Sequence, residues 1–147
     1  MKIVIACLIG ISMCLSCKTN DDSMKRRDEI SKIMKNYHLS YGFNHGFEIE
    51  GPFTIEQFKE DYVKREVERL GKVEDKSGKL KEVLDRIKRF PDSQKFKDFV
   101  RPVENDEGNE LYFFRSDLRS WKYLLGEEGY VIIDKNEVVY RMVTFMN

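Results

Sequence analysis

Cysteine is confined to the first seventeen residues of this chain. Cys7, Cys14 and Cys17 are its three cysteines, and residues 18–147 contain none. A domain built from those later residues can form no internal disulfide, whatever the redox state of its compartment, and has no cysteine nucleophile. Its stability must therefore come from the packing of a hydrophobic core.

The chain also lacks an excess of charge of either sign. Lys and Arg number 26, Asp and Glu also number 26, and the formal net charge is +0. Nucleic-acid-binding domains carry a basic face or stripe, so the composition gives no electrostatic case for a nucleic-acid partner. Histidine is scarce, and His38 and His45 alone do not make the ligand set of a metal site. We therefore expect no metal and no other cofactor.

Familiar catalytic motifs are missing as well. The sequence has no Gly-x-Ser-x-Gly turn, no phosphate-binding glycine loop and no His-Glu-x-x-His pair. Acidic residues are plentiful, at 48–50, 60–61, 104–110 and 127–128. A glycosidase needs two carboxylates across a cleft, and the sequence places no two of these that way. The composition therefore favours a binding domain over an enzyme.

The N-terminus has a pattern of its own. Lys2 is followed by the apolar run Ile3–Leu15 and then by Ser16-Cys17. A short basic start, an apolar core of about 7 to 15 residues and a small residue before the cleavage point are typical of a secretory signal. As a helix the run would span about 20 Å, short of the roughly 30 Å hydrocarbon core of a membrane. We predict a signal peptide over residues 1–16; the alternative is a buried strand or helix of a cytosolic domain.

Leu15-Ser16-Cys17 resembles the lipobox of bacterial lipoproteins, although Cys14 stands where that family usually has an aliphatic residue. The resemblance implies that Cys17 is acylated and attaches the protein to a membrane. Residues 17–22 are then the lipidated cysteine and a polar tether ending in two acids, similar to the tether of surface-exposed lipoproteins of Bacteroidota. The resemblance implies an exported protein, anchored at the outer membrane and exposed at the cell surface.

By length, residues 23–147 form a single domain. Apolar residues at helical spacing predict helices over 23–37, 54–70, 80–90 and 93–101. Thr54 and Gln57 form a capping box at the start of the second helix, whose charged residues, Arg65 and Arg69 among them, are predicted to cover its outer side. Pro91 ends the third helix, and the fourth is predicted to stop before Pro102.

The last third of the chain predicts strands over 111–114, 130–133 and 138–146, with a short helix between the first two. The final strand is apolar on both faces, which predicts a central or well-covered strand. A fourth strand would come from the stretch near Phe47 or from 100–104. The pattern predicts an α+β fold, in which N-terminal amphipathic helices pack on a C-terminal antiparallel sheet of three to four strands.

Two features are candidates for a binding site. Between residues 38 and 53, aromatic residues alternate with glycine and polar residues, so their rings could form a binding wall or, as is commoner, plug the core. On the short helix, the single tryptophan could stack on a sugar, although such a residue is more often part of the core. The candidate binding residues are Tyr41, Phe43, His45, Phe47 and Trp121.

These observations predict a lipid-anchored envelope protein whose domain binds a protein or glycan partner without catalysis. An immunity or inhibitor protein that neutralises a toxin is one form of this function. The alternative is a small envelope hydrolase or carbohydrate-binding accessory protein that uses the loop around Phe43 and Trp121. An open cleft lined by paired acids and aromatic rings would favour the alternative.

Overall fold

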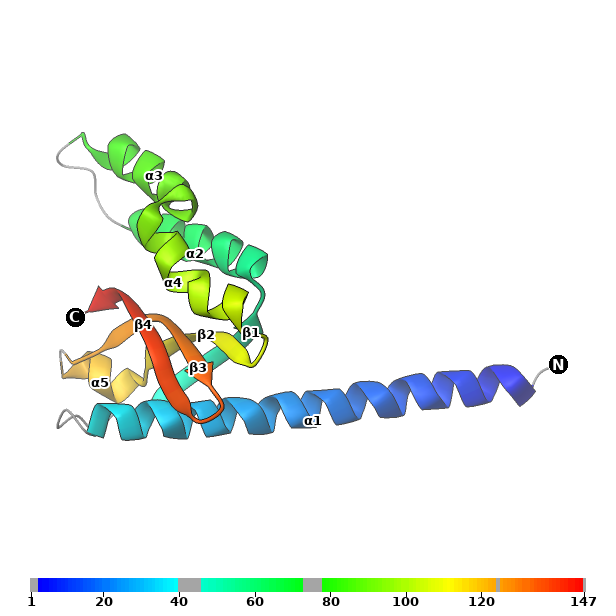
Figure 1. Ribbon diagram of the computed structural model, residues 1–147. Helices are drawn as coiled ribbons and strands as arrows, with labels where there is room; N and C mark the ends of the chain where they lie inside the picture. Colours follow the sequence, from blue (N-terminus) through cyan, green and yellow to red (C-terminus); the bar gives the residue numbers. More distant parts are fainter. Residues whose placement is uncertain (1–2, 40–45, 73–77, 124, 147) are drawn as a thin grey trace.

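The computed structural model describes residues 3–39, 46–72, 78–123 and 125–146, and the side chains of the first helix from Asp21 onward. Four antiparallel strands form one sheet in the order β1-β2-β3-β4, with helices on both of its faces (Figure 1). The predicted α+β class is confirmed. The elements are α1 (Ile3–Leu39), β1 (Phe47–Phe53), α2 (Ile55–Leu70), α3 (Leu80–Arg89), the 3-10 turn η1 (Phe90–Asp92), α4 (Gln94–Asn105), β2 (Asn109–Ser116), α5 (Leu118–Lys122), β3 (Glu127–Asp134) and β4 (Glu137–Met146).

The fourth strand of the sheet is β1, which begins at Phe47 and pairs with β2. The other stretch considered for this strand, 100–104, is helical and belongs to α4. The prediction that α4 stops before Pro102 was wrong, because the helix continues past it for three residues. The proline removes one backbone hydrogen bond, to the Asp98 carbonyl, and its own carbonyl accepts from the Asp106 N–H at 3.1 Å and from the Asn109 side chain at 2.9 Å.

Helix α1 is longer than the sequence predicted. It was expected to begin at residue 23 but runs from Ile3 to Leu39, through residues 17–22 that were predicted as a tether. These residues contain neither proline nor glycine, and Lys25 and Asp21 form an ion pair of 2.9 Å one helical turn apart. In Figure 1 the C-terminal part of α1 lies along the sheet, while its N-terminal part projects beyond it. Among the helices whose side chains are described, none is long and apolar enough to cross a membrane.

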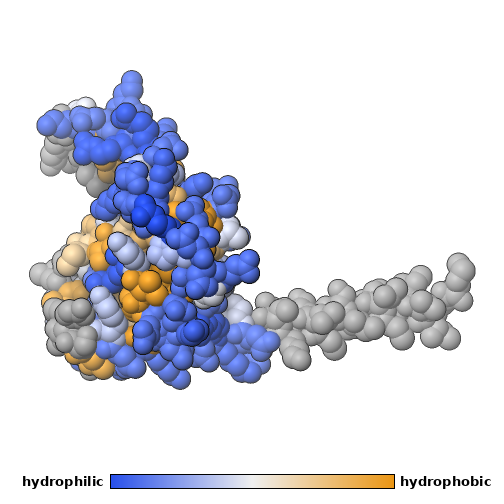
Figure 2. All heavy atoms as spheres, in the orientation of Figure 1, coloured by the Kyte–Doolittle hydropathy of each residue, from blue (hydrophilic) through white to orange (hydrophobic). Residues whose placement is uncertain are grey.

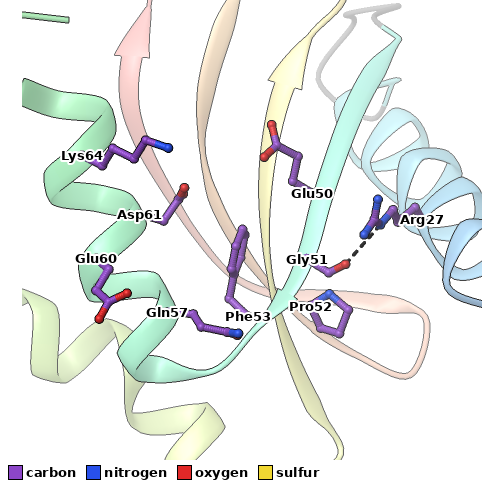
Figure 3. Close-up of a pocket in the computed structure, with 9 residues that line it drawn as sticks. All are labelled: Arg27, Glu50, Gly51, Pro52, Phe53, Gln57, Glu60, Asp61 and Lys64. Atoms are coloured by element: carbon purple, nitrogen blue, oxygen red, sulfur yellow. Dashed lines mark hydrogen bonds between the residues drawn. The ribbon is translucent and has the colours of Figure 1, made fainter. Parts of the chain in front are cut away.

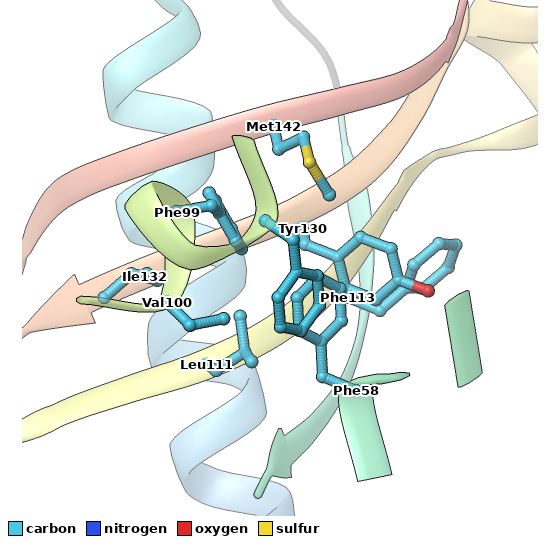
Figure 4. Packing of buried hydrophobic residues seen from close by; sticks show 9 residues of the cluster. Phe58, Phe99, Val100, Leu111, Phe113, Tyr130, Ile132 and Met142 are labelled. Atoms are coloured by element: carbon cyan, nitrogen blue, oxygen red, sulfur yellow. The ribbon is translucent and has the colours of Figure 1, made fainter. Parts of the chain in front are cut away.

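The sheet face toward α2 and α4 is covered by aromatic rings. The predicted capping box is confirmed: the Thr54 backbone N–H donates to the Gln57 side chain at 2.8 Å, and the Gln57 N–H donates back at 3.2 Å. The helix begun there carries Phe58, whose ring stacks on Phe96 at 4.9 Å and lies 4.5 Å from Tyr130 (Figure 4). This cluster comprises Phe58, Phe96, Phe99, Val100, Leu111, Phe113, Tyr130, Ile132 and Met142.

The opposite face of the sheet is covered by α1. Ile30 and Met34 are fully buried one turn apart on that helix. The Ser31 hydroxyl donates to the Phe47 carbonyl at 2.8 Å and so fixes α1 against the first strand. The buried members of this second cluster are Ile30, Met34, Phe47, Tyr112, Phe114, Val131 and Ile133.

The prediction of a central or well-covered last strand was wrong, because among the described strands β4 pairs only with β3, forms one edge of the sheet and is largely exposed or half-buried. The register between these strands shifts at Val139 and again at Thr144, so strict alternation does not hold along β4. As a result Val138 and Val143, which alternation had assigned to opposite faces, both pack against the α1 cluster. Apolar residues on both faces of β4 therefore do not indicate a covered strand here, because the strand lies at an exposed edge of the sheet.

Candidate binding groove at Trp121

The predicted site residues lie in three different situations. Tyr41, Phe43 and His45 fall outside the residues that the structure describes. Phe47 is only 8% exposed and its ring meets Phe114 edge-to-face at 5.9 Å, so it belongs to the core. Trp121 alone among the described candidates lines a surface hollow.

This hollow, which we call the Trp121 groove, has a volume of about 380 Å³. Five elements contribute to it, since α2 forms one wall, α5 the other, and strands β2, β3 and β4 lie between them. Cations outnumber acids among its residues, and the remaining side chains are apolar. The lining residues are Arg65, Glu68, Arg69, Lys72, Arg115, Leu118, Trp121, Glu128 and Phe145.

Trp121 is held rigidly in place. Asp117 caps the helix that carries it, accepting from the Ser120 N–H at 2.8 Å. The indole Nε1–H of Trp121 donates to the Ser116 carbonyl at 3.0 Å.

The ring of Trp121 also has close neighbours. It stacks against Phe145 at 5.6 Å, and it lies so near Gly126 that a Cβ on this glycine would fall 2.2 Å from the indole Cδ2. Only glycine fits at that position. A ring contacted by both residues is better suited to be a fixed apolar wall than an open platform for a sugar.

Two arginines of the groove are bound to the same buried carboxylate. Glu128 is 6% exposed, and its side chain pairs with Arg69 and accepts from the Arg115 Nε–H at 2.7 Å. A buried carboxylate is tolerated only when it is paired and hydrogen-bonded, so the two guanidinium groups are fixed at the base of the groove. The Arg115 side chain is still 42% exposed. Arg69 in addition lies over the ring of Phe145, at 4.7 Å from its centroid.

Arg65 extends the same arrangement one helical turn away. Its Nε–H donates to Asp61 at 2.7 Å, and its guanidinium carbon lies 3.7 Å from the centroid of the Phe113 ring. The Tyr130 hydroxyl also donates to Asp61, at 2.8 Å, and burial raises the pKa of Tyr130, so it remains a donor. These contacts set the position of Arg65 before any ligand arrives.

The remaining groove residues are available to a partner. Leu118 is 83% exposed, although it is a large apolar side chain. Lys72 and Glu68 are exposed, and neither forms an ion pair with any described residue. Because Glu128 is bound to two arginines, the groove offers one unpaired carboxylate where a glycosidase needs two. Its chemistry is suited to binding an anionic group beside an apolar one.

A second hollow, of about 500 Å³, lies between α1, β1 and α2 (Figure 3). Here the Arg27 Nε–H donates to the Gly51 carbonyl at 3.1 Å, and acids and bases are mixed around the rim. Asp61 and Glu50, which face this hollow, are both paired with Arg65. In the described part of the chain, no cluster of three or more His, Cys, Asp or Glu side chains could hold a metal. This hollow is the weaker candidate.

The groove position of the arginines was not predicted from the sequence. Arg65 and Arg69 were assigned to the outer side of α2, but both are largely covered, with side chains 18% and 22% exposed. Their spacing of four places them on one side of the helix, which the sequence does show. That this side meets the ends of β2 and β3 depends on tertiary packing, which no local pattern encodes.

Comparison with known proteins yields no relative. No family model matches the chain, and neither a curated protein nor a solved structure matches it. Any function must therefore be argued from this chain's own residues.

Proposed function

We propose that this chain is a lipid-anchored protein of the cell envelope whose domain binds an acidic protein partner in the Trp121 groove, without catalysis. One observation supports the binding role above the others. Three arginines held by buried or half-buried acids surround the exposed Leu118 and the fixed ring of Trp121. Tryptophan and arginine are the residues most enriched at the energetic centres of protein interfaces.

The charge of the groove indicates the chemistry of the partner. Among the lining residues four cations, Arg65, Arg69, Lys72 and Arg115, meet two acids, Glu68 and Glu128. Arg65 and Arg69 are also paired with acids outside the lining, so Lys72 and the half-exposed Arg115 are the cations expected to meet carboxylates of a partner. The exposed Leu118 is expected to meet an apolar side chain of that partner. Neutralisation of a toxin would be one form of this binding.

The proposed anchor rests on the N-terminal residues. The apolar run ending in Leu15-Ser16-Cys17 and its resemblance to a lipobox support acylation of Cys17 after export. The polar residues that follow support an outer-membrane site facing outward. Contacts between α1 and the sheet begin, among described side chains, at Arg26, which donates to Glu110 at 2.9 Å through Nε. The segment from Cys17 to Arg26 would therefore separate the domain from the lipid.

Metabolic labelling with a fatty-acid analogue tests the anchor. The wild-type chain should take up the label, and Cys17→Ala should lose it while remaining an uncleaved precursor or being cleaved elsewhere. Cys14→Ala is the matched control and should still be labelled. Unchanged labelling of Cys17→Ala would overturn the proposed lipid attachment and leave the groove unaffected.

The groove can be tested through its own fluorophore. Trp121 is the only tryptophan of the chain, so selectively excited tryptophan emission reports on the groove alone. Polyglutamate, as an acidic polypeptide probe, should change this emission in a saturable, salt-sensitive way. Polylysine should leave the emission unchanged. Polygalacturonate, an anionic glycan, serves as the comparison that distinguishes a glycan partner from a polypeptide partner. Tighter binding of polygalacturonate would favour a glycan partner and contradict this proposal.

Two exposed positions give variants that should fold normally. Lys72→Glu and Leu118→Asp each place a negative charge in the groove, and both should weaken polyglutamate binding. Lys81→Glu and Met24→Asp introduce the same changes at exposed positions away from it. Equal weakening by these controls would mean that the probe senses overall charge, not the groove.

A further inference from the structure

The two edges of the sheet are protected to very different degrees. The β1 edge has seven residues, carries Glu48 and Glu50, and contains Pro52, which has no N–H to offer a further strand. Helix α1 also packs against it, as the Ser31 hydrogen bond to Phe47 shows. The β4 edge has ten residues and contains neither proline nor lysine. Natural sheets protect long edges by such residues, by β-bulges and by inward-pointing charges; β4 has two register shifts and the Arg141–Glu127 ion pair, and between those shifts residues 140–143 keep a regular edge.

Apolar side chains are exposed along this open edge. Four large apolar side chains of β4 are exposed, namely Val139, Tyr140, Phe145 and Met146. Met146 is 69% exposed. Apolar residues gather on the surface where β4 runs across the domain (Figure 2). In the described part of the chain, β3 is the only strand that pairs with β4. The other backbone edge of β4 is therefore open to a partner.

The open edge is continuous with the Trp121 groove. Phe145 belongs to β4 and also lines the groove, where it contacts Trp121 and Arg69. The register shift at Thr144 brings this about, because it turns Phe145 toward α2 while Val143 stays on the α1 side. A chain that paired with β4 and continued past Thr144 would reach Phe145, over whose ring the guanidinium group of Arg69 lies.

We propose that the partner in the groove is an extended acidic segment of a protein, which adds to the sheet as a fifth strand along β4. This inference rests on the proposed function and specifies how the partner binds. Regular pairing with β3 covers residues 140–143, between the two register shifts, and the added strand pairs with this stretch. Main-chain hydrogen bonds provide affinity in such strand addition, and alternate side chains provide selectivity.

The two faces of β4 define the chemistry of the added strand. On the α1 side, Val138 and Val143 favour apolar neighbours, and Arg141 between them is already paired with Glu127. On the other side, Tyr140 packs edge-to-face on Phe99 at 6.1 Å, and the groove cations lie beyond Phe145. A segment in which apolar and acidic residues alternate therefore fits, with its acids on the groove side.

A synthetic peptide of alternating glutamate and valine tests this mode of binding on the full-length protein. Its binding should alter Trp121 emission and protect from hydrogen exchange those backbone amides of residues 140–143 that point away from β3. The same peptide methylated at every backbone nitrogen keeps the side chains but cannot donate to β4. It should bind about tenfold or more weakly, since two or three main-chain hydrogen bonds are lost.

Each outcome decides between the two proposals. Equal affinity of the methylated peptide, or binding without amide protection in β4, would overturn strand addition while leaving the acidic groove intact. Failure of every acidic probe to alter Trp121 emission would overturn both. Concentration-dependent protection of β4 amides without any peptide would show that a second copy of the chain covers the edge, which also overturns the inference.

Discussion

Glu127 and Glu128 are neighbours on β3, yet they serve two different regions of the molecule. Glu127 faces α1. Its Oε1 lies 2.9 Å from the His38 Nε2, and its carboxylate also forms an ion pair with Arg141. Glu128 faces α2 and pairs with Arg69 and Arg115 in the Trp121 groove. Both glutamates are buried and both hold arginine, so their charge and burial do not distinguish the regions.

The partners of the two glutamates make the difference. The cluster around Glu127 is closed, because His38 is itself buried and Arg141 packs over the rings of Tyr37 and Phe114. The cluster around Glu128 is open, because Arg115 remains half-exposed beside Leu118. A closed cluster fixes α1 to the sheet, whereas an open one presents fixed cations to solvent. The same ion-pair chemistry therefore has a structural role on one face and supports binding on the other.

The cores beneath the two regions should differ most when a ring is removed. Phe58 contacts three other aromatic residues of its cluster, so Phe58→Ala should cost about 3–5 kcal/mol of the free energy of unfolding. Ile30→Val, which removes one methylene from the α1 side, should cost about 0.5–1.5 kcal/mol. Urea denaturation of both variants measures the contrast. Equal losses would show that the Phe58 ring is packed far less tightly than its three ring contacts indicate.

The closed cluster should be the more sensitive of the two glutamate sites. Glu127→Gln leaves Arg141 without its carboxylate in a buried position, and should cost about 1.5–3 kcal/mol. Glu128→Gln should cost less, because the exposed Arg115 can return to water. Comparison of the two denaturation midpoints checks this order. If Glu128→Gln were the more destabilising variant, the distinction between closed and open clusters would not hold.

Acid should act in opposite directions on the buried Glu127 and the half-buried Glu66. Burial raises the pKa of Glu127, but the hydrogen bond and charge of His38, with Arg141, outweigh it and hold this pKa below its ordinary value of 4.5. Its contribution to stability is therefore present above pH 4.5 and is lost as the pH falls through the folded-state value. Burial raises the pKa of Glu66 above 4.5 despite Arg69, so this carboxyl favours the folded state as the pH falls toward 4.5.

The pH dependence of unfolding in single variants separates these two carboxyls. Glu127→Gln should flatten the loss of stability below pH 4.5, whereas Glu66→Gln should steepen the decline in stability on acidification just above it. Thermal melts across that range measure both slopes. A change of the same sign in the two variants would contradict the assignment of Glu127 to a charge-stabilised site and Glu66 to a desolvated one.

The sequence predicted the elements better than their surroundings. The capping box at Thr54 is a local pattern, and it correctly located the start of α2. The edge position of β4 was not predicted. Strict alternation assigned apolar residues to both faces of the strand, as in a covered strand, but two register shifts change which face each residue lies on. Trp121 was recognised by its rarity, but the arginines beside it come from α2 and β2, which meet only in the folded chain.

Leu118 should affect binding with little effect on stability. Its side chain is 83% exposed, so Leu118→Ala should change the free energy of unfolding by less than about 0.5 kcal/mol. The same variant should weaken the change in Trp121 emission on addition of polyglutamate. A large loss of stability would show that the Leu118 side chain is packed in the folded domain. Leu118 would then not be part of the proposed interface.

The smallest effect is expected at the start of α1. The described side chains of this helix contact the sheet through Arg26, Ile30 and later residues, and Met24, just before them, is exposed. Asp21, Asp22, Met24 and Lys25 are exposed, so we expect removal of residues 1–17 to alter the free energy of unfolding by less than about 0.5 kcal/mol. Urea denaturation of a chain beginning at Lys18, compared with full-length Cys17→Ala, measures the difference.

The chain should unfold cooperatively and identically with or without reductant, because no cysteine remains. A chain that failed to fold would show that the α1 face depends on residues beyond the closed cluster, and that the first helix supports the sheet along more of its length than Arg26 to His38.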